Sequence, residues 1–188
     1  MEIAWETDLE AALARARKER KPVFLEFIKD PCPECDRLNA DTFSDPRVQA
    51  EITGRFIPLR LNLRRDRDAV RRYNLFWTPT LYFLDPHGEA RAESVGYLPP
   101  DELLPLLDYG EAHVVLRRGK FLRAAELFDL LVERYPTSGL AAEALYWAAN
   151  VHYLITGDEA VLTAKRAELV ERYPDSFAAK RVKPLLEG

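Results

Sequence analysis

The chain has 188 residues, of which 47% are apolar, and its formal net charge is −4. The apolar share is enough for one large core or two small ones, whereas the small charge argues against a nucleic-acid or membrane surface. Because no apolar run approaches the ~20 residues that span a bilayer, and residues 1–6 do not resemble a signal peptide, we expect a cytoplasmic protein.

The first predicted elements are a helix and a strand. Thr7-Asp8-Leu9-Glu10 has the pattern of a capping box, with Thr7 as the cap, and apolar residues then recur at helical spacing from Leu9 to Ala16. Residues 23–28 are apolar on both faces of a predicted strand, as in a central strand that is covered on both sides. Glu26 is the one charged residue in that strand, and a lone acid is costly to bury.

The only two cysteines follow that strand directly, in Asp30-Pro31-Cys32-Pro33-Glu34-Cys35. In the first turn of a helix this spacing brings the two Cα atoms to roughly 5–6 Å, which suits a reversible disulfide. The N–H groups at a helix start stabilise a thiolate, so Cys32 is predicted to be the nucleophile and the more exposed thiol. Pro33 suits the first helical position, whereas the carboxylate of Glu34 disfavours the thiolate.

The rest of the first 108 residues has the order strand, helix, proline motif, strand, turn and strand. These segments are residues 56–63, 66–73, Trp77-Thr78-Pro79-Thr80, 81–84, 85–88 and a strand ending at 95–96. Together with the CxxC motif, this order resembles the thioredoxin fold. The segments 43–48 and 96–100 further resemble the branch that includes bacterial thiol-disulfide interchange proteins.

The resemblance implies an α/β domain over residues 1–108, with a central mixed sheet and helices on both faces. It also implies that Pro79, 44 residues after Cys35, is a cis-proline facing the sulfurs, a form that only X–Pro bonds adopt at modest cost. Thr78 and Pro79 would then dock the backbone of an extended peptide. Trp77 would either cover the disulfide or fill the core.

Further roles follow from the same resemblance. Cys32 would attack a substrate disulfide, Cys35 would resolve the mixed disulfide, and Glu26 would exchange protons with Cys35. The alternative for Glu26 is a strand-end carboxylate that reaches solvent or an arginine. Pro33 and Glu34 replace the usual Gly-Pro between the cysteines, at positions that tune reduction potential and partner choice. The implied partners are protein substrates with disulfides and an electron-donor reductase, and no organic cofactor is required.

A structural zinc site at the cysteine pair would need two further ligands. The sequence has no second CxxC motif and no HxxxH spacing. We therefore expect no metal within one chain, while a metal shared between two subunits stays open.

Residues 109–188 are predicted to be helical and contain an internal repeat. Leu131-Val132-Glu133-Arg134-Tyr135-Pro136 recurs as residues 169–174, with a period of 38 residues. The spacing from Gly119 to Pro136 resembles the tetratricopeptide signature, in which a glycine turns between two helices and a proline follows the second. The resemblance implies an all-α tetratricopeptide-like domain that could bind a protein partner, with a final helix at residues 178–186.

Two functions from different classes fit these features. The first is a thiol-disulfide oxidoreductase that acts on protein disulfides through Cys32 and Cys35. The second is a protein-interaction module in which the cysteine pair is a redox sensor or a vestige. Catalytic turnover separates them, because only the first accelerates the reduction of a protein disulfide.

Overall fold

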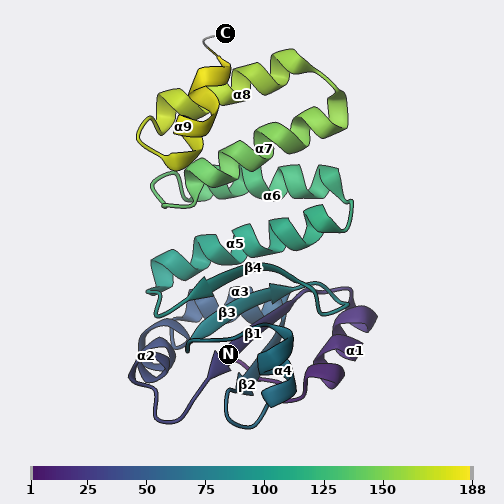
Figure 1. The fold of residues 1–188 in the computed structure, drawn as a ribbon, viewed down its shortest axis with the longest axis vertical. Coiled ribbons are helices and arrows are strands. Elements are labelled where there is room, and N and C mark those ends of the chain that lie inside the picture. Colours follow the sequence, from purple (N-terminus) through teal and green to yellow (C-terminus); the bar gives the residue numbers. More distant parts are fainter. Residues whose placement is uncertain (1, 187–188) are drawn as a thin grey trace. The chain divides into compact units, whose positions relative to one another are not determined.

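A computed structural model describes residues 2–186 of the chain (Figure 1). The chain divides into two compact units, Met1–Gly110 and Glu111–Gly188, which we describe separately. Within residues 2–186, every helix is too short or too polar to cross a membrane.

The first unit is built on a four-stranded mixed sheet, as predicted. Its strands have the order β2-β1-β3-β4, in which β1 and β2 run parallel and the other neighbours run antiparallel. The strands are β1 (Val23–Ile28), β2 (Ile57–Asn62), β3 (Thr80–Leu84) and β4 (Ala90–Val95).

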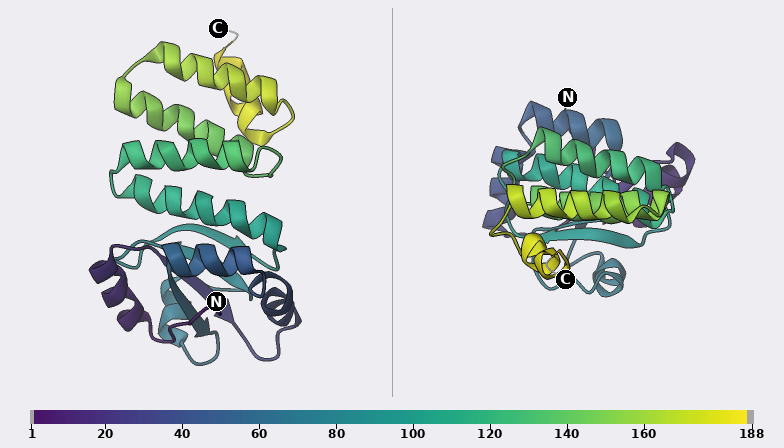
Figure 2. Two further views of the ribbon diagram at one scale, coloured as in Figure 1. Left: turned by 180° about the vertical axis from the view of Figure 1, so that it is seen from behind. Right: turned by 90° about the horizontal axis from the view of Figure 1, so that it is seen from above.

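Helices cover both faces of this sheet, which confirms the α/β thioredoxin fold class predicted from the sequence. α1 and α4 pack on one face (Figure 1), and α3 lies on the opposite face (Figure 2). The helical segments of this unit are α1 (Leu9–Glu19), α2 (Pro33–Arg37), the π-helical turn η1 (Leu38–Thr42), α3 (Pro46–Arg55), α4 (Arg67–Arg72) and the start of α5 (Pro100–Arg117).

β1 is buried on both faces, and its alternating side chains divide between two cores. Leu25 and Phe27 join the cluster formed with α1 and α4. Phe24 points to the other face, where its ring centroid lies 5.4 Å from that of Phe83 and 6.1 Å from that of Phe56. Because alternate residues of a strand share a face, Glu26 lies on the same side as Phe24.

The predicted capping box at the start of α1 is wrong by one residue. Asp8 is the N-cap, and its carboxylate accepts a hydrogen bond of 2.7 Å from the backbone N–H of Ala11. Aspartate caps at least as well as threonine. The helix therefore begins at Leu9, and Glu10 lies too early in it to complete the box with Thr7.

The first part of α5, up to Gly110, belongs to the first unit. The ring of Phe83 lies so close to Gly110 that an added methyl group there would overlap it. Asp108, where the sequence places the domain boundary, is a buried residue of α5 whose Oδ1 lies 2.5 Å from Nη1 of Arg55. A glycine and a buried ion pair thus fasten this part of α5 to the first unit.

The second unit is helical, and consecutive helices pack against one another. Both copies of the repeated sequence lie at the end of a helix. Tyr135 and Tyr173, which cap these two helices, have nearly the same backbone angle, φ −131° and −133°. The predicted final helix is shorter than expected, because Pro184 cannot continue an α-helix. The tetratricopeptide arrangement stays a prediction. The elements are α6 (Phe121–Arg134), α7 (Ala141–Thr156), α8 (Glu159–Arg172), α9 (Phe177–Val182) and the 3-10 turn η2 (Lys183–Leu185).

Candidate active site

The two cysteines form a disulfide at the start of α2. Cys32 is the N-cap of that helix, Pro33 is its first residue, and Cys35 lies one turn in. The Cα atoms are 5.3 Å apart, within the range predicted from the spacing. The backbone N–H of Cys35 points at Sγ of Cys32, at an N···S distance of 3.2 Å. The helix start therefore directs a donor at the predicted nucleophile, as a thiolate requires.

The two cysteine residues are equally buried, and the greater exposure of the Cys32 thiol in the reduced protein stays a prediction. In the disulfide form each cysteine residue is only 3% exposed. The difference between them lies in their contacts, because Cys32 caps the helix whereas Cys35 is inside it.

The Thr78–Pro79 peptide bond is cis, and it lies against the disulfide. Sγ of Cys32 is 3.8 Å from the carbonyl oxygen of Thr78 and 3.7 Å from its hydroxyl oxygen. Both Thr78 and Pro79 are buried. Trp77 is 49% exposed, so the alternative in which it fills the core is wrong. A second cis bond, Asp30–Pro31, precedes the cysteines, and no feature of the sequence had indicated it.

Glu26 is completely buried and paired with an arginine of the neighbouring strand. Nε of Arg60 donates a hydrogen bond of 2.6 Å to Oε2 of Glu26, whereas Oε1 of Glu26 has no hydrogen-bond partner. Burial raises the pKa of Glu26 to about 7, although the charge and hydrogen bond of Arg60 act to lower it. Glu26 is thus both buried and paired with an arginine, so features of both predicted alternatives are present.

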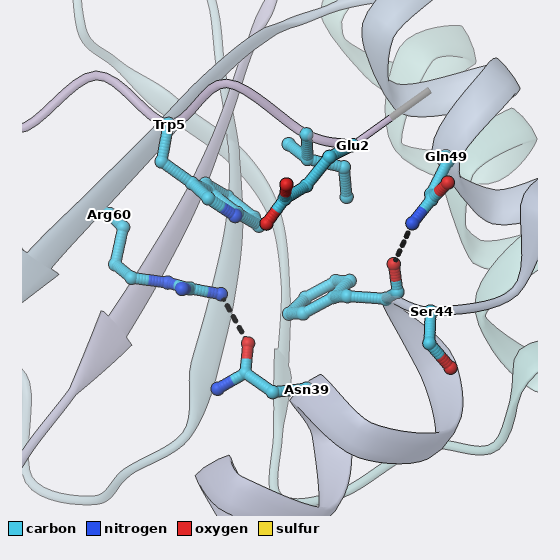
Figure 3. Close-up of a pocket in the computed structure, with 8 residues that line it drawn as sticks. Glu2, Trp5, Asn39, Ser44, Gln49 and Arg60 are labelled. Carbon is cyan, nitrogen blue, oxygen red and sulfur yellow. Dashed lines mark hydrogen bonds between the residues drawn. The ribbon is translucent and has the colours of Figure 1, made fainter.

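Arg60 also forms one wall of a cavity of about 470 Å³ (Figure 3). Its Nη2 donates a hydrogen bond of 2.7 Å to Oδ1 of Asn39, and its guanidinium carbon lies 4.2 Å from the ring centroid of Trp5. These contacts fix the guanidinium group while its outer edge faces the cavity. The sequence analysis missed Arg60. The sequence held one hint of this pair, because each of the two apolar strands carries a single charged residue. The parallel register places these two residues opposite each other.

Glu34 reaches from the CxxC motif to the loop after β4. Its Oε2 accepts a hydrogen bond of 3.2 Å from the backbone N–H of Tyr97. The neighbouring N–H of Gly96 donates to the carbonyl oxygen of Pro79 at 2.8 Å. The helix start, the loop after β4 and the cis-proline turn are therefore linked around the disulfide. Among residues 2–186, no group of three His, Cys, Asp or Glu side chains is placed to hold a metal ion.

A family comparison agrees with this geometry. Residues 9–111, more than half of the chain, match the thioredoxin-like domain family. The chain belongs to the thioredoxin-like family. The disulfide at the start of α2 and the cis bond at Pro79 agree with what the sequence resemblance implied.

The thioredoxin-like part is similar to several thiol-disulfide interchange proteins. It is 38% identical over 85 residues to the thiol:disulfide interchange protein DsbD 1 of Pseudomonas aeruginosa, which covers 43% of this chain and 14% of that protein. It is 33% identical over 91 residues to DsbD of Salmonella typhi, covering 46% of this chain and 16% of that protein. The chain thus spans less than a fifth of the length of these relatives.

Solved structures show the same fold. A thioredoxin from Thermus thermophilus is 30% identical, with a TM-score of 0.53, over 58% of this chain and 87% of that one. The oxidised C-terminal domain of DsbD from Neisseria meningitidis is 24% identical, with a TM-score of 0.50, over 57% of this chain and 99% of that one. At that lower identity the second likeness shows the fold alone.

Proposed function

We propose that this chain is a thiol-disulfide oxidoreductase that reduces protein disulfides through Cys32 and Cys35. The observation that carries the proposal is the cysteine pair at the start of α2, with Sγ of Cys32 3.7 Å from the hydroxyl of Thr78 in the cis-proline turn. In this proposal the cis-proline turn docks the backbone of an extended substrate, with the half-exposed Trp77 beside it.

The reaction begins with the reduced protein. The thiolate of Cys32 attacks one sulfur of the substrate disulfide, and the other substrate sulfur leaves as a thiolate. Cys35 loses its proton and attacks Sγ of Cys32, which releases the second substrate thiolate and forms the Cys32–Cys35 disulfide. Two electrons pass from the protein to the substrate, and a dithiol donor such as a reductase restores the protein.

We assign to Glu26 the role of the base that accepts the proton of Cys35. A general base works best when its pKa lies near the working pH, and burial raises the pKa of Glu26 to about 7. Its Oε1 has no hydrogen-bond partner and can accept a proton. Arg60 keeps the carboxylate form accessible through its hydrogen bond to Oε2.

We infer that the couple works in the reducing direction. The helix start stabilises the thiolate of Cys32, but Glu34 adds a negative charge within the same motif. A weakly stabilised thiolate gives the reduced state little advantage, so we expect a reduction potential near that of thioredoxin, about −270 mV. Equilibration with glutathione buffers measures it, and a potential near the −120 mV or so of a strong oxidant would reverse the direction.

The decisive experiment is the reduction of insulin by dithiothreitol, with and without the protein. We expect acceleration by the full chain and none by Cys32→Ser. Cys35→Ser should accumulate mixed disulfides with its substrates, which gel analysis under non-reducing conditions detects and mass spectrometry identifies. Without acceleration by the full chain, the cysteine pair would instead be a sensor or a vestige. Partner binding by the helical unit and the cytoplasmic location stay predictions.

A further inference from the structure

Two exposed aromatic residues lead directly into the cis-proline turn. Phe76 is 78% exposed and Trp77 is 49% exposed. Single exposed apolar side chains are ordinary on protein surfaces. These two are consecutive, however, and the next residue is Thr78, which contacts Sγ of Cys32. We call Phe76 and Trp77 the aromatic ledge.

The backbone beneath the ledge is held in place. The hydroxyl of Thr80 donates a hydrogen bond of 2.9 Å to the carbonyl oxygen of Trp77. Nζ of Lys29 lies 5.7 Å from the centroid of the Trp77 ring, and Thr78 beside it is buried. A rigid aromatic anchor loses little conformational entropy when a partner covers it, so the contact area contributes to affinity.

Glu34 is linked to the same turn through the loop after β4. Its carboxylate is half-buried and fixed by the N–H of Tyr97, and Gly96 next to it bonds the carbonyl of Pro79. Among residues 2–186, no lysine or arginine forms an ion pair with Glu34. A carboxylate partly withdrawn from water, with one neutral donor, gains from a cation that approaches it.

We propose that the aromatic ledge and Glu34 select the substrate peptide. The preferred substrate is an extended segment whose cysteine is flanked by a large apolar side chain, which covers Phe76 and Trp77, and by a lysine or arginine, which pairs with Glu34. This inference rests on the proposed function, because the cysteine of such a segment must reach Cys32 beside Thr78. It adds a specificity that the redox chemistry alone does not require.

Short peptides with one cysteine, carried as a mixed disulfide with thionitrobenzoate, test the selection. Four peptides differ only in the two residues that flank the cysteine: Phe with Lys, Phe with Gln, Ser with Lys, and Ser with Gln. The released chromophore gives the rate constant for reaction with the reduced full chain. We expect Phe with Lys to react about tenfold or more faster than Ser with Gln, as for a contact of about 1.4 kcal/mol.

Variants assign each preference to its residue. Phe76→Ser should remove the preference for Phe over Ser, and Glu34→Gln should remove the preference for Lys over Gln. Each preference is a ratio of two rates within one variant, so changes in the reactivity of Cys32 cancel. Phe177→Ser, which removes a 72% exposed aromatic from α9, and Asp36→Asn, which removes a charge from α2, are the matched controls and should leave both ratios unchanged.

A small uncharged substrate separates this inference from the proposed function. If the reduced protein reacts with hydroxyethyl disulfide but all four peptides react equally, the selection is overturned and the redox function stands. If Asp36→Asn abolishes the lysine preference as Glu34→Gln does, a diffuse field and not Glu34 recognises the cation. If hydroxyethyl disulfide does not react either, both the function and the selection fail.

Discussion

Arg60 and Glu26 form an ion pair between neighbouring parallel strands, with Nε of Arg60 2.6 Å from Oε2 of Glu26. Glu26 is fully buried, whereas the side chain of Arg60 is 21% exposed and borders the cavity of Figure 3. Burial alone would make the carboxyl strongly prefer the protonated form. The arginine opposes that preference and leaves the pKa of Glu26 at about 7.

Removing the arginine should therefore raise the pKa of Glu26 further. For Arg60→Gln we expect a rise of about 1 to 3 in pKa, the usual effect of an adjacent arginine. A carbon-13 NMR titration of the Glu26 carboxyl carbon measures it. Arg91→Gln is the matched control, because it breaks the pair of Arg91 with Asp85 in the same unit. An unchanged pKa in Arg60→Gln would mean that the pair has little influence on Glu26.

Glu26 should also make the stability of the protein depend on pH. Its pKa is about 7 in the folded protein, against 4.5 as the ordinary value, so the folded state favours the protonated form. The contribution of protonated Glu26 to the free energy of unfolding is complete below pH 4.5 and is lost as the pH rises through 7. The loss should be of order 3 kcal/mol. Urea unfolding of the wild type and of Glu26→Gln at pH 5 and pH 8 checks this, because only the wild type should lose that stability.

Sequence patterns predicted the parts of the site that depend on local chain chemistry. The spacing of Cys32 and Cys35, with Pro33 between them, indicated a helix start, and the resemblance to the thioredoxin fold implied the cis bond at Pro79. The partners across the sheet were missed. Arg60 faces Glu26 only once β1 and β2 pair in parallel, and that register depends on the whole core.

The same limit applies to Glu34 and to the aromatic ledge. The sequence predicted an electrostatic effect of Glu34 on Cys32, but its bond to Tyr97 joins residues 63 positions apart. The sequence left two alternatives open for Trp77, covering the disulfide or filling the core, and did not single out Phe76. Their exposure becomes visible only when the buried Thr78 and Pro79 are placed against the disulfide.

His113 should make the helical unit sensitive to acid. Its ring is buried between Phe128 and Trp147, at centroid distances of 5.2 and 5.0 Å. Burial, with a smaller effect from the charge of Arg117, lowers the pKa of His113 from 6.5 to about 4. The folded unit therefore favours neutral histidine, and its stability is lost as the pH falls from 6.5 towards 4, by an amount of order 3 kcal/mol.

The near-ultraviolet circular dichroism of Trp147 reports this loss. We expect the midpoint temperature of thermal unfolding of the wild type to be lower at pH 4.5 than at pH 7. The fall should be smaller in His113→Gln, which has no titrating ring. His87→Gln, at an exposed turn, is the control. Equal falls in the wild type and His113→Gln would contradict the assignment to His113.

The last prediction concerns the order in which the two thiols react. We expect Cys32 to stay at the N-cap of α2 after reduction. In the oxidised form the backbone nitrogen of Cys35 lies 3.2 Å from the sulfur of Cys32. That donor and the helix start stabilise a thiolate on Cys32, whereas the sulfur of Cys35 lies within the helix. Limited alkylation with iodoacetamide at neutral pH should therefore modify Cys32 first, as peptide mapping can show.

Because Glu34 opposes the thiolate of Cys32, Glu34→Gln should react with iodoacetamide faster than the wild type, and Cys32→Ser should react more slowly than both. Preferential labelling of Cys35 in the wild type would exchange the roles of the two cysteines.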